Sequence, residues 1–188
     1  MRSTLLVILM AFSASVNAEG LDYTYLQGSY GQITFDDALL DVDGDGFGIS
    51  GSYATTDSIH LYGEYQTSEL DFSVDLDFLE AGVGYHMPVS ETLDFVAELG
   101  YIQVEIGAPG IPSFDESGLT LGVALRGMIG EALELNGGLD YIDFSDADGE
   151  TRIDLGFQYH VTETFSAGAS ATVWDDINVY KLSARFNF

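Results

Sequence analysis

Cysteine is absent from the 188 residues, and basic side chains are scarce. Without cysteine the chain has no disulfide, no thiolate metal site, no cysteine nucleophile and no lipoprotein anchor. Five Lys and Arg stand against 31 Asp and Glu, which gives a formal net charge of -26. Because nucleic-acid binding is driven by basic groups that displace counterions from phosphates, the composition excludes nucleic acid as a partner.

No apolar run is long enough to cross a bilayer as a helix, which takes about 20 residues. Near the N-terminus, Leu5–Phe12 is a shorter apolar run that follows Arg2 and precedes the small residues of Val16-Asn17-Ala18. This order is typical of an export signal. We expect a signal peptide over residues 1–18, cleaved after Ala18, and a single domain over residues 19–188.

From Tyr23 onward the chain instead shows a period-two alternation of apolar and polar residues, which predicts β-strands and an all-β fold. In one segment Ile59, Leu61 and Tyr65 alternate with His60 and Glu64. Ten segments are candidate strands: Tyr23–Phe35, Gly46–Ala54, Ile59–Gln66, Leu79–His86, Leu93–Tyr101, Leu119–Arg126, Leu133–Tyr141, Ile153–Val161, Phe165–Trp174 and Ile177–Phe188.

The connections between these segments alternate between tight turns and mostly longer loops. This pattern predicts an antiparallel up-and-down β-barrel of about ten strands, with both termini on the short-turn side. The expected turns are Thr55–Ser58, Pro88–Thr92, Ile129–Ala132 and Thr162–Thr164, and the expected loops are Asp36–Asp45, Ser68–Asp77, Gly107–Ser117, Asp143–Glu150 and Asp175–Asp176.

Alternation fits both a transmembrane barrel with an apolar exterior and a soluble barrel or sandwich with an apolar interior. The apolar faces carry no charged residue, and the opposite faces mix glycine, small polar residues and charges. These features favour the transmembrane barrel, with rings at both membrane interfaces. The expected girdles are Tyr53, Tyr85, Phe95, Tyr159 and Phe165 near the turns, and Phe47, Tyr65, Tyr101, Tyr141 and Tyr180 near the loops.

The last predicted strand ends the chain with apolar residues on one face: Tyr180, Leu182, Ala184, Phe186 and Phe188. A final strand of this kind resembles the signal that the outer-membrane insertion machinery recognises. With its Tyr-rich first strand and Asp-Gly-Asp-Gly segment, the chain resembles the small OmpA/OmpX-like outer-membrane barrels. The resemblance implies a Gram-negative outer membrane, lipid and lipopolysaccharide as surroundings, and eight strands as the alternative to ten. It implies little about activity.

The basic residues that follow the predicted signal peptide all have the parity of the polar face. Confined charges of this kind are expected to pair, which predicts an interior ion-pair plug. The alternative is a narrow, cation-preferring channel for small solutes, since the acids outnumber the bases. The predicted interior charges are Arg126, Arg152, Lys181 and Arg185, with Glu64, Glu80, Asp94, Glu98, Glu134, Asp140 and Asp154.

Three histidines, His60, His86 and His160, have the same inward parity and lie near short turns. They raise the hypothesis of a metal site or pH gate, but we favour separate hydrogen-bonded histidines. No histidine lies near Ser113 and its acidic neighbours, so we expect no hydrolytic site and no enzyme.

Asp41, Asp43 and Asp45 have the spacing that opens a calcium loop, but Ser52 occupies the twelfth position, where a bidentate Glu is needed. We therefore predict no specific metal site and no cofactor. Acidic loops can still bind divalent cations loosely and bridge to lipopolysaccharide phosphates. The sequence thus favours an outer-membrane barrel with a structural or interaction role.

Overall fold

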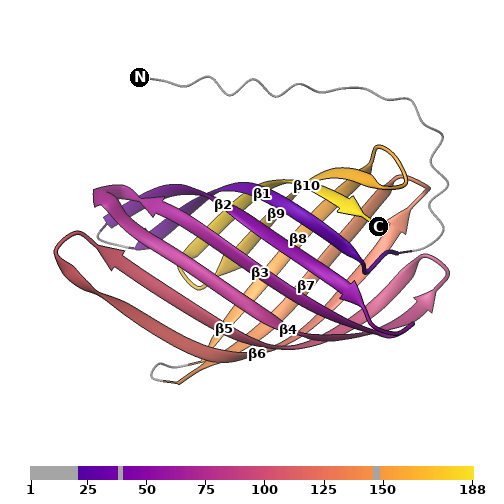
Figure 1. The fold of residues 1–188 in the computed structure, drawn as a ribbon, viewed down its shortest axis with the longest axis horizontal. Helices are drawn as coiled ribbons and strands as arrows, with labels where there is room; N and C mark the ends of the chain where they lie inside the picture. The colour runs from indigo at the N-terminus through magenta and orange to yellow at the C-terminus, as the bar shows by residue number, and fades with distance from the viewer. Residues whose placement is uncertain (1–20, 38–39, 146–148) are drawn as a thin grey trace.

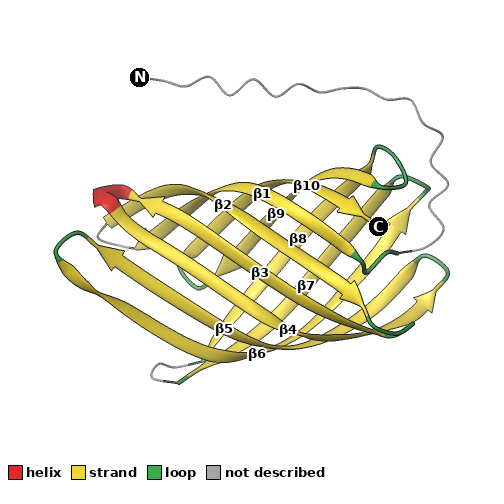
Figure 2. Ribbon diagram, in the orientation of Figure 1, coloured by secondary structure: helices red, strands yellow, loops and turns green. Residues whose placement is uncertain are grey.

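The computed structural model describes residues 21–37, 40–145 and 149–188, which form one closed barrel of ten antiparallel strands (Figures 1 and 2). The expected ten strands are confirmed, and the alternative of eight is wrong. The described residues include one short 3-10 helix, η1 (Asp71–Ser73), and no helix with the length and hydropathy to span a membrane. The strands are β1 (Tyr25–Asp37), β2 (Leu40–Ala54), β3 (Ile59–Leu70), β4 (Val74–Ser90), β5 (Leu93–Ala108), β6 (Ile111–Ile129), β7 (Leu133–Phe144), β8 (Glu150–His160), β9 (Phe165–Trp174) and β10 (Ile177–Asn187).

Each strand pairs with its neighbour in sequence, and the first and last strands close the barrel. The β1–β10 ladder runs in register from Tyr25 opposite Asn187 to Phe35 opposite Ile177. β1 starts and β10 ends on the side of the short turns, as the alternation of turns and loops predicts (Figure 1).

The strands extend further at the loop end than the sequence pattern predicts. The segments expected as the loops Asp36–Asp45, Ser68–Asp77 and Gly107–Ser117 are mostly strand, so these three predictions are wrong. Ladder pairing continues through acidic residues, for example between Glu105 and Asp115. Acidic composition marks these segments as exposed to water, but it does not prevent backbone pairing between neighbouring strands.

The outward faces of the strands are apolar along most of their length. Leu121, Leu155 and Leu182 expose more than 60% of their surface, and the ten girdle aromatics lie on these outward faces. Between the two girdles, the charged side chains of the same strands have the opposite parity. Beyond the girdle on the loop side, acidic residues such as Asp45 and Asp77 share the outward parity. The water-soluble alternative, which needs an apolar interior and a polar exterior, is therefore wrong.

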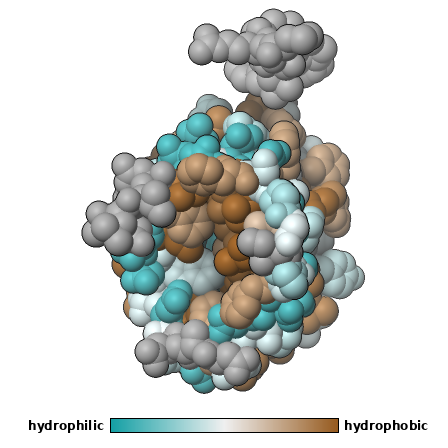
Figure 3. Space-filling view, turned by 90° about the vertical axis from the view of Figure 1, so that its left-hand side faces the viewer, coloured by the Kyte–Doolittle hydropathy of each residue, from teal (hydrophilic) through white to brown (hydrophobic). Residues whose placement is uncertain are grey.

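The interior has two parts, of which the sequence pattern predicts one. Toward the short turns it is polar and charged, as expected. Toward the loops it is apolar, and Figure 3 shows hydrophobic residues around the hollow at this end. We call these buried residues the mouth cluster: Ile33, Leu70, Leu76, Ile102, Ile142, Trp174 and Val179.

Candidate functional site

The interior charges form two ion-pair clusters at different heights in the barrel. The one nearer the short turns, the Glu134 cluster, centres on a carboxylate that is 1% exposed. Arg126 of β6 donates to both Glu134 oxygens, from Nε at 2.8 Å and from Nη2 at 2.9 Å. Arg185 of β10 donates from Nη1 at 3.0 Å, and His160 Nε2 lies 3.3 Å away. One carboxylate thus joins four strands and faces two guanidinium groups.

The second cluster has the opposite balance of charge. Arg152 of β8 lies 2.9 Å from Glu80 of β4, 2.9 Å from Asp140 of β7 and 3.2 Å from Asp154 of its own strand. In this Arg152 cluster one guanidinium faces three carboxylates. Glu80 also accepts a hydrogen bond from Tyr62, at 3.2 Å.

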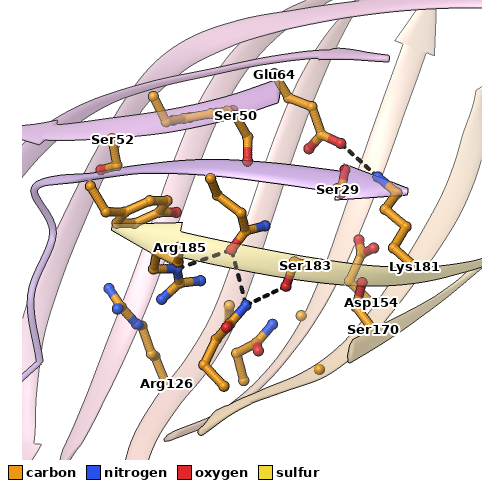
Figure 4. A pocket seen from close by; sticks show the side chains of 18 of the residues that line it. Ser29, Ser50, Ser52, Glu64, Arg126, Asp154, Ser170, Lys181, Ser183 and Arg185 are labelled. Carbon is orange, nitrogen blue, oxygen red and sulfur yellow. Dashed lines mark hydrogen bonds and ion pairs between the residues drawn. The ribbon is translucent and has the colours of Figure 1, made fainter. Parts of the chain in front are cut away.

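A separate ion pair lies beside the Arg152 cluster. Lys181 of β10 donates to Glu64 of β3 at 2.6 Å, across the β1 and β2 strands (Figure 4). Asp154 also accepts a hydrogen bond from Thr172 of β9. Because Lys181 and Glu64 neutralise each other, the acidic excess of the Arg152 cluster is not removed by this pair.

Near the short turns, Tyr23 folds back into the barrel ahead of β1. Its ring stacks on His86 with centroids 3.7 Å apart, and its hydroxyl donates to Asp94 at 3.0 Å. Arg126 lies 4.6 Å from the Tyr23 ring centroid. Burial raises the pKa of the Tyr23 phenol above its ordinary value, against the opposing charge of Arg126. The ring therefore packs into the barrel as a neutral hydrogen-bond donor.

Two of the three histidines meet in this region, contrary to the interpretation of three separate histidines. His60 Nδ1 lies 3.2 Å from His86 Nδ1, and His60 Nε2 lies 3.2 Å from Glu98. A carboxylate only accepts hydrogen bonds, so Nε2 of His60 is the donor. His160 belongs to the Glu134 cluster instead. Among the described residues, no group of three or more His, Cys, Asp or Glu is arranged to hold a metal ion.

Two glycines make room for the polar side chains of the interior. A Cβ atom at Gly84 would lie 2.2 Å from the His60 ring, and one at Gly122 would lie 2.1 Å from an Asp140 oxygen. No other residue type fits at these positions while the neighbouring side chains keep their places. The inward glycines of the alternation pattern therefore shape the interior.

The side chains leave a cavity of about 280 Å³ along the charged part of the interior. Its wall includes most of both ion-pair clusters, and Figure 4 shows several of its polar residues. A smaller cavity of about 70 Å³ lies between the Arg152 cluster and the mouth cluster, lined on one side by Phe78, Ile102 and Trp174. The two cavities share Glu64, Asp154 and other charged residues.

All eleven predicted interior charges lie on the inward side, and each of them makes one of the contacts above. The predicted assembly residues lie on the exposed outer face, in β10 and directly after it: Tyr180, Leu182, Ala184, Phe186 and Phe188. Asp43 and Asp45 are exposed and belong to β2 rather than to a loop, and Asp45 accepts a hydrogen bond from Tyr30 at 3.1 Å. The side chain of Asp41 and the predicted signal peptide lie outside the described residues.

The sequence reasoning missed the mouth cluster and the position of Tyr23. Ile102, Ile142 and Trp174 follow Glu98, Asp140 and Thr172 at even spacing, so their inward parity was readable in the sequence. The parity of Tyr23 was ambiguous, because Tyr23, Tyr25 and Tyr30 do not share one face of a strand.

An apolar exterior and a charged interior inside a closed ladder define a transmembrane β-barrel, because every backbone polar group is then satisfied within hydrocarbon. Residues 4–178 match the family model for the outer membrane protein beta-barrel domain. The chain belongs to this family, which places it in the Gram-negative outer membrane.

Comparison with solved structures finds chains that are similar at low sequence identity. The KdgM porin matches at 10% identity and a TM-score of 0.49, covering 86% of this chain and 99% of the other. Ail, the attachment invasion locus protein of Yersinia pestis, matches at 15% identity and a TM-score of 0.43, covering 89% and 100%. The N-terminal barrel domain of Pseudomonas aeruginosa OprF matches at 18% identity and a TM-score of 0.44, covering 89% and 98%. A comparison with curated protein sequences finds no match.

Proposed function

We propose that the protein is a structural and interaction barrel whose interior is plugged by ion pairs. The observation that carries this proposal is the cross-barrel bonding of the two clusters. Arg152 bonds to carboxylates on two other strands, and Glu134 receives bonds from three other strands. Moving these groups aside to pass a solute breaks buried ion pairs, and a buried charge without its partner is costly.

A narrow cation-preferring channel is the second candidate function. The cavity of about 280 Å³ favours it, because its lining has six carboxylates and four basic groups among the described residues. An acidic lining favours cations over anions.

Single-channel recording of the refolded protein in a planar bilayer under a salt gradient tests the two candidates. The plugged barrel predicts an inserted protein without conductance steps. Small cation-selective steps that change in Glu98→Gln or Arg126→Met would establish the channel instead. Heat-shifted mobility on a denaturing gel confirms in parallel that each variant is folded.

We further propose that the acidic loop end binds divalent cations and bridges to lipopolysaccharide. Asp43, Asp45 and Asp75 are exposed there, and all four described basic residues have inward parity. Calorimetric titration of the bilayer-embedded barrel with Mg²⁺ tests this. We expect weak, salt-sensitive binding that falls when Asp43 and Asp45 are changed to Asn, and no effect from Glu91→Gln at the opposite end.

Residues 1–18 are proposed to direct export and to be removed after Ala18. The outward face of β10 is proposed to engage the insertion machinery. Mass measurement of protein from the outer-membrane fraction tests the cleavage site. Replacement of Phe188 by Ser tests the assembly role. We expect less barrel in the membrane, while the same variant refolded from denaturant keeps its stability.

A further inference from the structure

The apolar lining of the mouth continues outside the barrel on the inner side of the β5–β6 hairpin. Ile102, Val104 and Ile106 share one parity along β5, and Ile106 pairs with Phe114 of β6. Exposure rises along this row, from 1% at Ile102 to 42% at Ile106 and 60% at Phe114. If these residues formed a hydrophobic core that sealed the end of the barrel, all of their side chains would be buried. The row instead forms an apolar path from water into the barrel.

The path ends at a cavity that is apolar on one side and charged on the other. The cavity of about 70 Å³ is lined by Phe78, Ile102 and Trp174 on the side of the mouth. Its charged side has three carboxylates and two basic groups: Glu64, Glu80, Asp154, Arg152 and Lys181. It adjoins the larger cavity of about 280 Å³, with which it shares the charged residues. Together they give room for a small molecule of mixed polarity.

The charge beneath the mouth favours a positively charged occupant. The Arg152 cluster has one guanidinium and three carboxylates among the described residues, while Glu64 and Lys181 neutralise each other. Two negative charges therefore remain in a partly buried space, where uncompensated charge is costly. A bound cation offsets this cost, whereas an anion increases it.

The aromatic wall favours an organic cation over a hydrated metal ion. The ring of Trp174 lies 5.3 Å from that of Phe78 and 6.1 Å from that of Phe144, measured between centroids. Apolar rings of this kind attract alkylammonium groups and bury hydrocarbon, but they offer nothing to a metal ion that keeps its water shell.

We propose that the loop end of the barrel binds a small amine with an apolar body. The hydrocarbon part packs against Trp174, Phe78 and Ile102. The ammonium group donates hydrogen bonds to Asp154 and to Glu64 Oε2, whereas Lys181 bonds to Glu64 Oε1. The apolar row on β5 and β6 leads from water to this site, so the amine enters and leaves by the mouth. This inference goes beyond the plugged barrel and does not depend on it.

Trp174 is the single tryptophan of the chain, so its fluorescence reports directly on the site. The probe is hexylamine, added to the protein in lipid nanodiscs. Hexan-1-ol has the same tail without charge, hexanoate has the opposite charge, and potassium chloride supplies a cation without a tail. We expect a saturable change in Trp174 emission with hexylamine, at least tenfold weaker binding of hexan-1-ol, and no saturable change with the other two.

Variants separate the amine site from general partitioning into lipid. Glu64→Gln and Asp154→Asn should each weaken hexylamine binding about tenfold, while Glu91→Gln, a matched change at an exposed short turn, should leave it unchanged. Ile106→Ser should weaken binding severalfold, with Val89→Ser at the other end as its control. The Glu64 side chain is 41% exposed, so Glu64→Gln tests the site even where Asp154→Asn fails to fold.

Three results would overturn the proposal: equal binding of hexylamine and hexan-1-ol, an emission change produced by potassium chloride alone, or no saturable change with hexylamine. Conductance does not enter this test, so an open channel in the planar bilayer contradicts the plugged barrel without affecting the amine site.

Discussion

The two ion-pair clusters use the same chemical groups in opposite proportion. In the Glu134 cluster two arginines share one carboxylate that is 1% exposed, whereas in the Arg152 cluster three carboxylates share one arginine. The first is rich in cations near the short turns, and the second is rich in anions beneath the mouth. Removing a carboxylate should therefore have opposite consequences in the two clusters.

The largest effect is expected from Glu134→Gln, which leaves Arg126 and Arg185 buried without their counter-charge. We expect a loss of about 3–5 kcal/mol in the free energy of unfolding, as when one partner of a buried ion pair is removed. Urea titration of the refolded barrel, followed by tryptophan fluorescence, measures this. The matched control is Glu64→Gln, the same change at a half-exposed carboxylate. Equal losses in both variants would contradict the proposed importance of burial.

Arg152→Met should cost nearly as much, about 3 kcal/mol, because it leaves three carboxylates facing one another. The second change Asp140→Asn should restore part of this loss by removing one of the repelling charges. The unfolding midpoints in urea of the single and double variants measure the interaction between the Arg152 and Asp140 substitutions. A double variant less stable than Arg152→Met would show that the carboxylates do not repel.

A smaller effect of the opposite sign is expected from Asp140→Asn alone. Asn keeps the shape that fits over Gly122 and lowers the acidic excess around Arg152. We expect stability to stay within about 1 kcal/mol of the parent, on the favourable side. A loss above about 2 kcal/mol, measured in the same urea titration, would remove the distinction between the clusters.

The smallest effect is expected from Lys181→Met. Its partner Glu64 has a side chain that is 41% exposed, so solvent screens the pair. The expected loss is about 1 kcal/mol or less, and it should shrink further in high salt. Urea titrations at low and high sodium chloride measure both quantities. A salt-independent loss of several kcal/mol would assign this pair to the buried network.

The sequence predicts which way most charges face but not which of them meet. Alternation along one strand assigns Arg126 and Glu134 to the interior, because parity is a local property. Their bidentate contact depends on the register between strands and on the height of each residue in the barrel. The alternation within a single strand determines neither of these. The contact of His60 with Glu98, two strands away, is hidden for the same reason.

The mouth cluster was missed for another reason. Acidic residues around Leu70 and Leu76 suggested the loop Ser68–Asp77, and apolar residues on the inward parity contradicted the expectation of a polar interior. Both expectations are averages over a whole barrel, whereas this interior changes character along its axis. If the inward residues are grouped by their position along the barrel axis, the apolar Trp174 and Ile142 near the loops are distinguished from Thr172 and Asp140 nearer the short turns.

The pairing of β1 with β10 also constrains the order in which the protein assembles. Tyr25 meets Asn187, so the closing ladder joins the first described strand to the last, and it cannot form until nearly all of the chain is available. Contacts this distant in sequence form slowly. Until they form, the N–H and C=O groups of both edges are unpaired, a state that hydrocarbon does not tolerate. Entry into the membrane and closure of the ring must therefore be coupled in time.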